Sequence, residues 1–219
     1  MRMGQYYRAL ILKEKNIRKP NKYGCLPSPE CKPMAYSPLD YDNLYKLLEW
    51  SYIGNSFLDT VLTQLIRPLD DKKKRLLAFV GDYSELKENV KIPKDLKDYR
   101  YCINAAHEMV WNMYGEKAIS VKGANRSIDT YSGEWYAVDR TAHEYVKLFD
   151  LPLACPGWDG HINPVGILCA TSNGLGGGDY RGHVNEDMAG RWAFHDIVVT
   201  AGENIDESYL EIKPDFTEE

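Results

Sequence analysis

The sequence has no apolar stretch long enough to cross a membrane. A transmembrane helix needs about 20 consecutive apolar residues, and no part of the 219-residue chain reaches that length. The first residues also lack the apolar core and cleavage site of a secretory signal peptide. We therefore expect a cytoplasmic protein that makes no membrane contact.

The sequence has no excess of positive charge. It carries 27 Lys and Arg against 32 Asp and Glu, a net charge of −5. The overall electrostatic field of the protein therefore does not attract nucleic acid. Its one dense basic run, residues 72–75, follows two aspartates and precedes a strand pattern, which favours a solvated turn. We expect no nucleic-acid partner.

Cysteine is scarce, and its five copies are an odd number in mostly apolar context, which suits a reducing cytoplasm better than a disulfide framework. Cys25 and Cys31 stand close together, but no second Cys or His pair at matching spacing completes a zinc site. His195 and Asp196 would lie on opposite faces of a strand. The sequence therefore predicts no metal site, names no cofactor and leaves catalysis undecided.

What the sequence does contain is a series of strand patterns with few helices between them. The strand patterns cover residues 5–12, 75–80, 118–121, 134–138, 145–148, 164–170 and 191–200. Helical spacing of apolar residues occurs at 44–48, 57–65 and 103–114. Because several strands follow one another directly, we expect an α+β fold with a mixed, mostly antiparallel sheet and about three helices.

Two strand patterns allow more detailed predictions. The continuous apolar run 75–80 is typical of a strand covered on both faces. Residues 145–148 are predicted to pair back onto 135–138 through a short turn. We expect one globular domain over 1–219, with a Pro- and Cys-rich loop insertion at 19–38 and an acidic tail at 205–219 that partly frays.

The most unusual segment is the glycine-rich loop at 171–183, which follows the apolar pattern 164–170 directly. Four of its glycines fall within five residues, and glycine costs about 0.5–1 kcal/mol of backbone entropy relative to alanine. Such a loop indicates positive φ or a close approach to a ligand or to another chain segment. It is neither a Walker motif nor a dinucleotide-binding fingerprint, but its successive N–H groups could form an anion-binding nest.

A second candidate position is the end of the strand at 75–80, since side chains at strand ends commonly face clefts. Asp82 and Asp179 together could provide an acid–base pair if they lie close. We predict a ligand site from the loop, this strand end and a helix break near residue 54. Its residues are Asn173, Gly174, Gly176, Gly177, Gly178, Asp179, Tyr180, Gly81, Asp82, Tyr83, Glu49 and Asn55.

Most of these residues also have a purely structural interpretation. Asp82 could form a turn, and Asn55 could cap a helix. The glycines could simply allow a tight connection that lets Tyr180 enter the core. The sequence leaves these alternatives open.

Several segments keep a common order along most of the chain. They are Met3-Gly-Gln-Tyr-Tyr7, Tyr41-Asp-Asn-Leu-Tyr-Lys-Leu-Leu-Glu-Trp-Ser-Tyr-Ile-Gly-Asn55, Val80-Gly-Asp-Tyr83, Trp135-Tyr-Ala-Val-Asp139, Glu144-Tyr-Val146, Asn173-Gly-Leu-Gly-Gly-Gly-Asp-Tyr180, Gly190-Arg-Trp-Ala193 and Asp196-Ile197. In these the chain resembles a family of uncharacterised bacterial and phage proteins with no established activity. Where that family has Val-Asn-His, this chain has Val138-Asp139-Arg140. The resemblance implies a phage or mobile-element setting and a single structural unit.

Three hypotheses of function follow. The first is binding of a small polar, nucleotide-like ligand in a cleft lined by residues 173–180 and 81–83, with the nest for phosphate and Asp179 for sugar hydroxyls or a base amine. The second is a hydrolase or transferase acting on a nucleotide, with Asp82 and Asp179 as acid and base. The third is a protein–protein interaction module with a tyrosine-rich face, suggested by 16 tyrosines. Oligomeric state is not predicted.

Overall fold

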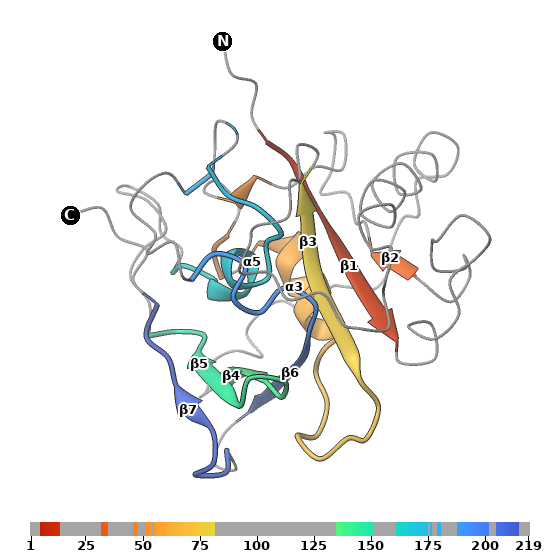
Figure 1. The fold of residues 1–219 in the computed structure, drawn as a ribbon, viewed down its shortest axis with the longest axis vertical. Helices are drawn as coiled ribbons and strands as arrows, with labels where there is room; N and C mark the ends of the chain where they lie inside the picture. Colours follow the sequence, from red (N-terminus) through yellow and green to blue (C-terminus); the bar gives the residue numbers. More distant parts are fainter. Residues whose placement is uncertain are drawn as a thin grey trace.

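The computed structural model describes residues 5–13, 32–34, 46–47, 51–53, 55–81, 135–150, 161–174, 176, 179–180, 188–201 and 205–214. These residues form an α+β arrangement of seven strands and two short helices (Figure 1). The strands are β1 (Tyr7–Lys13), β2 (Lys32–Met34), β3 (Arg75–Gly81), β4 (Trp135–Asp139), β5 (Glu144–Lys147), β6 (His195–Ala201) and β7 (Leu210–Glu211). The helices are α3 (Ser56–Thr63) and α5 (Pro164–Leu168).

The strands form one mixed sheet in the order β2-β1-β3-β6-β4-β5-β7. All neighbours pair antiparallel except β5 and β7, which are parallel. The predicted return of 145–148 onto 135–138 is confirmed, with Ala137 opposite Val146 and Asp139 opposite Glu144. The predicted fold class is therefore confirmed in its broad form.

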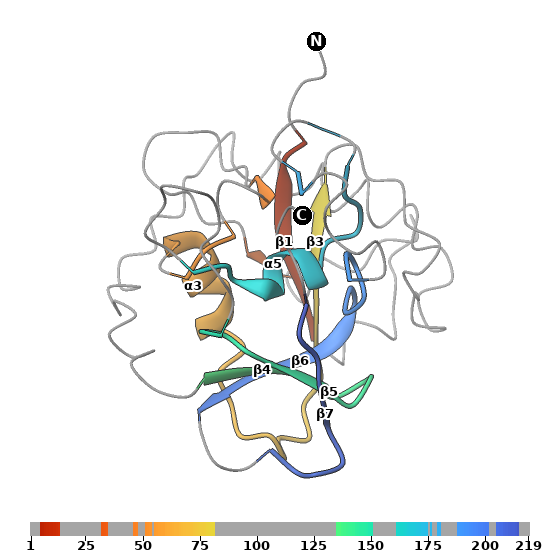
Figure 2. The same ribbon diagram turned by 90° about the vertical axis from the view of Figure 1, so that its left-hand side faces the viewer.

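β6 joins the two halves of the sheet. Its first two residues, His195 and Asp196, pair with β3, whereas Ile197–Ala201 pair with β4. Figure 2 shows β1 and β3 running at a steep angle to β4, β5 and β6. The polar residues at the start of β6 therefore lie where the sheet changes direction, and we call His195 and Asp196 the joint.

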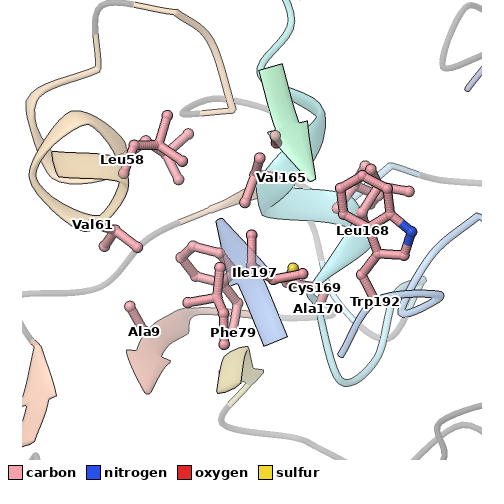
Figure 3. Close-up of a cluster of buried hydrophobic side chains, with 14 of the residues drawn as sticks. Ala9, Leu58, Val61, Phe79, Val165, Leu168, Cys169, Ala170, Trp192 and Ile197 are labelled. Atoms are coloured by element: carbon pink, nitrogen blue, oxygen red, sulfur yellow. The ribbon is translucent and has the colours of Figure 1, made fainter. Parts of the chain in front are cut away.

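The main hydrophobic core lies between one face of the sheet and the two helices. Figure 3 shows Leu58 and Val61 of α3, Val165 of α5, Phe79 of β3 and Ile197 of β6 directed into one cluster. The opposite face of β4 and β6 carries a smaller cluster, formed by Tyr136, Val138 and Val198. Both faces of β3 are buried from Leu76 to Gly81, as the continuous apolar run predicted.

Helix α3 begins where the sequence indicates it. The Asn55 side chain accepts a hydrogen bond from Leu58 N at 3.2 Å, so the capping interpretation of Asn55 is confirmed. Such a cap contributes about 1 kcal/mol of stability. Apolar residues at helical spacing, Leu58, Val61 and Leu62, then face the core.

The prediction of a strand at 164–170 is wrong, because the segment begins with helix α5. All five helical residues are buried, and an apolar run buried on every side has no periodicity that separates helix from strand. The missed signal is the pair Asn163-Pro164. Asn163 caps the helix by accepting from Val165 N at 3.1 Å, and proline suits the first helical position.

Other expectations need smaller corrections. The strand predicted over 191–200 begins only at His195, the 19–38 segment contains β2, and the tail contains β7. The described residues hold two helices rather than three. The predicted helix at 103–114 and strand at 118–121 lie outside the described residues, as does most of 44–48. No helix in the described ranges is long and apolar enough to span a bilayer.

Candidate functional site

The glycine-rich loop is brought to the end of β3 by backbone pairing. Phe79 N donates to Cys169 O, and Thr171 N donates to Phe79 O, each at 2.8 Å. The chain leaving α5 thus runs beside β3 for a short distance. The loop that follows Thr171 therefore starts close to Gly81.

Gln5 lies between the two predicted segments. A Cβ atom at Gly81 would lie 2.0 Å from Gln5 Nε2, and one at Gly176 would lie 2.1 Å from Gln5 N. Gln5 is fully buried, and its Nε2 donates to Ser172 Oγ at 2.7 Å. At Gly176 glycine is therefore required by close approach to the backbone of Gln5, just before β1, whereas at Gly81 the close approach is to the Gln5 side chain.

Asp179 is a buried carboxylate in the same place. It is 1% exposed, and its Oδ2 accepts from Tyr7 Oη at 3.2 Å and from Gly176 N at 3.3 Å. Tyr7 Oη also lies within hydrogen-bond distance of Ser172 O, at 2.8 Å. We call Gln5, Tyr7, Thr171, Ser172, Asn173 and Asp179 the loop cluster.

Three oxygen atoms of the loop cluster have no hydrogen-bond partner in the described part of the chain. They are Gln5 Oε1, Thr171 Oγ1 and Asn173 Oδ1. Gln5 and Thr171 are fully buried, so bulk water does not reach their side-chain oxygens. Buried acceptors of this kind normally have partners, which makes the cluster unusual.

The remaining predicted site residues are placed as follows. Asn173 is half-buried and donates through Nδ2 to Tyr180 O. Gly174 is exposed and has φ +78°, with open space around its Cβ position. Tyr180 lies in the main core, whereas Asn55 is at the start of α3. Outside the described residues lie Glu49, Asp82, Tyr83, Gly177 and Gly178.

Sequence reasoning missed a second polar group at the joint. His195 Nδ1 lies 2.5 Å from Asp139 Oδ2, and the two residues are 56 positions apart in sequence. Beside them Arg191 pairs with Glu144, its Nε donating to Oε2 at 2.8 Å, and Trp192 Nε1 donates to the same oxygen at 2.9 Å. The one feature of the sequence that pointed to this polar group was Asp139, which directly follows the predicted strand at 134–138.

This environment shifts the pKa values of Glu144 and Cys169 in opposite directions. Hydrogen bonds from Arg191, and then from Trp192, lower the pKa of Glu144 against the opposing effect of burial, and His195 lowers it further. Burial raises the pKa of the Cys169 thiol far above its usual range, and the nearby Asp139 carboxylate adds to this. The thiol therefore stays protonated and is not a reactive nucleophile.

The lowered pKa of Glu144 makes a pH prediction possible. A depressed carboxyl pKa gives stability that is present above the unfolded value, here about 4.5, and is lost as the pH falls through the folded value. Above about pH 5 we expect Glu144→Gln to unfold about 1–2 kcal/mol more easily than the wild type. Below pH 4.5 this difference should shrink, as measured by urea denaturation across the acid range. A constant difference would contradict it.

The other face of the joint is an ion-pair network around Asp196. Asp196 Oδ1 accepts from Arg67 Nη2 at 2.6 Å and from Arg75 N at 2.8 Å. Its Oδ2 accepts from Arg140 Nη2 at 2.6 Å and Nε at 3.0 Å. Since this carboxylate has all its acceptor positions engaged, it serves structure rather than ligand binding.

Within the described ranges, no group of three or more His, Cys, Asp or Glu side chains could hold a metal ion. No family model, curated protein or solved structure matches this chain. The resemblance to uncharacterised bacterial and phage proteins, and the cytoplasmic location, therefore stay predictions.

Proposed function

We propose that this protein binds a small polar ligand of nucleotide type at the loop cluster. The observation that carries the proposal is the trio of unpartnered oxygens on Gln5, Thr171 and Asn173. Leaving a buried acceptor without a donor costs about 1–3 kcal/mol. A ligand that presents hydroxyl or amino groups to these oxygens would recover part of this cost.

The nucleotide character of the ligand rests on two features. Asp179 supplies a buried carboxylate, an acceptor suited to ribose hydroxyls or a base amino group. The loop supplies an exposed glycine in the left-handed region, Gly174, and successive N–H groups in such conformations can form a nest for phosphate. Sugar and phosphate recognition would thus come from adjoining parts of one loop.

The test is calorimetric titration of the protein with a panel of nucleosides and nucleotides. The deciding variant is Thr171→Val, which removes a buried hydroxyl that has no hydrogen-bond partner among the residues that the structure describes. We expect it to bind the ligand about tenfold more weakly, since one hydrogen bond is lost. Without ligand it should be at least as stable as the wild type, because no hydrogen bond to the described residues is broken and an unpartnered buried hydroxyl is removed.

Thr200→Val on β6 is the matched control, and it should leave affinity unchanged. A second variant, Asp179→Asn, should weaken the binding of nucleosides and of nucleotides by the same factor. If the loop recognises phosphate, the wild type should bind each nucleotide more tightly than the corresponding nucleoside. The proposal fails if no compound of the panel binds, or if Thr171→Val binds as tightly as the wild type.

The two other hypotheses stay predictions. An Asp82 and Asp179 acid–base pair would show itself as product formation in the same titrations, but Asp82 lies outside the described residues. A tyrosine-rich interaction face receives no support from Tyr7, Tyr136 and Tyr180, which are all buried.

A further inference from the structure

The pair Asp139–His195 has the geometry of an oriented base. Asp139 is fully buried, and its Oδ1 accepts from the backbone N–H groups of Thr141 at 2.7 Å and Ala142 at 3.1 Å. These two bonds fix the carboxylate at the β4–β5 turn. The other oxygen, Oδ2, is left to receive Nδ1–H of His195 at 2.5 Å.

This arrangement selects one form of the imidazole. A neutral ring that donates from Nδ1 to a carboxylate carries its lone pair on Nε2. No group in the described ranges hydrogen-bonds Nε2, and the His195 side chain keeps 14% exposure. Nε2 is thus an oriented proton acceptor with no structural use in that part of the protein.

Backbone strain is concentrated at the same place. Two non-glycine residues of the described chain have positive φ, His143 at 58° and Phe194 at 63°. Phe194 directly precedes His195, and His143 directly precedes Glu144, the carboxylate whose pKa His195 lowers. Such conformations cost about 1–3 kcal/mol each and gather at functional sites, whereas a purely structural ion pair requires none.

We infer that Asp139 and His195 form a second reactive site, in which Nε2 acts as a general base toward water or a hydroxyl group of a small polar substrate. In that step the O–H bond breaks and its proton bonds to Nε2, which leaves an oxyanion on the water or hydroxyl group, and Asp139 stabilises the resulting imidazolium. The described charged groups around the pair are Glu144 with its partner Arg191, and Arg140 with Asp196, which are the sequence neighbours of Asp139 and His195. The buried Cys169 thiol takes no part. The site is independent of the loop cluster, because His195 pairs with Leu77, four residues and about 14 Å along β3 from Gly81.

The probe is diethyl pyrocarbonate, which transfers a carbethoxy group to an unprotonated imidazole nitrogen. The nitrogen bonds to the carbonyl carbon, ethyl carbonate leaves and gives carbon dioxide and ethanol, and the ring proton passes to buffer. At about pH 8, above the reference pKa of free imidazole, peptide mapping would compare His195 with the exposed His161 in one sample. We expect His195 to react faster despite its greater burial.

Asp139→Asn should slow the reaction of His195 at least about tenfold. The new carboxamide would present an N–H donor to Nδ1, so Nδ1 would become the acceptor and the ring proton would move to Nε2. His161 should keep its rate, and Asp150→Asn, an exposed carboxamide control, should change neither. A His195 that reacts more slowly than His161 overturns the inference. If Asp139→Asn does not fold, nitrogen-15 NMR of the wild type decides: neutral His195 protonated on Nε2 also overturns it.

Discussion

Replacing Asp196 by alanine is expected to lower the free energy of unfolding by about 3–5 kcal/mol. The side chains of Asp196 and Arg67 are only 5% and 3% exposed, and the carboxylate also binds Arg140 and the backbone of Arg75. Burial already lowers the pKa of Arg67, and Asp196 is the group that counteracts this. Without it the buried guanidinium loses its nearer counter-charge and keeps only Asp71, whose Oδ2 lies 3.6 Å from Arg67 Nη1. Urea denaturation measures the loss.

The matched control is Asp150→Ala. Asp150 also forms an ion pair, with Lys147 at 3.7 Å, but its side chain is 63% exposed. Exposed pairs contribute about 0–1 kcal/mol, so this variant should be close to the wild type. If the two alanine variants were equally stable, the ion-pair network around Asp196 would not stabilise the fold as expected.

The second large effect is expected at Gly176. A Cβ there would lie 2.1 Å from Gln5 N and 2.8 Å from Gln5 Cα, so backbone must move to admit it. We expect Gly176→Ala to cost about 3 kcal/mol, at the upper end for an overpacked site. Thermal and urea unfolding would measure the loss.

Two other glycines serve as controls for this prediction. At Gly174 an added Cβ would meet no atom within 4 Å, and only the φ of +78° disfavours a side chain there. We therefore expect Gly174→Ala to lower the free energy of unfolding by about 1 kcal/mol. Gly81→Ala meets the end of the Gln5 side chain, and adding Gln5→Ala should recover part of its stability. The same addition should not rescue Gly176→Ala, because its clash is with backbone. If Gln5→Ala restored stability to both glycine variants, the clash at Gly176 would also be with the Gln5 side chain and not with its backbone.

These results would also bear on how the glycine-rich loop is interpreted. The sequence left open whether its glycines serve a ligand or the chain itself. At Gly81 and Gly176 the close approach is to Gln5, so these glycines have a structural reason within the chain itself. Gly174 is different, since it is exposed and a Cβ atom there would meet no described atom within 4 Å. The ligand proposal therefore depends on the unpartnered oxygens of the loop cluster rather than on the glycines.

Local patterns in the sequence determined most of the described elements. Alternating or continuous apolar residues predicted β1, β3 and the β4–β5 hairpin, and Asn55 ahead of an apolar helical face predicted α3. These signals involve residues within a few positions of one another, where backbone geometry alone decides which side chains share a face. The turn with Lys72, Lys73 and Lys74 is exposed, as its charge predicted.

Only the tertiary structure decided what the polar residues do. Gln5 meets Ser172 across 167 positions, Arg67 meets Asp196 across 129, and His195 takes Asp139 rather than its neighbour Asp196 as partner. It also decided that 164–168 is a helix, because burial on every side removes the periodicity that would distinguish it. Periodicity records which face of an element is buried, but not which distant side chain lies opposite. That depends on how the sheet bends at β6.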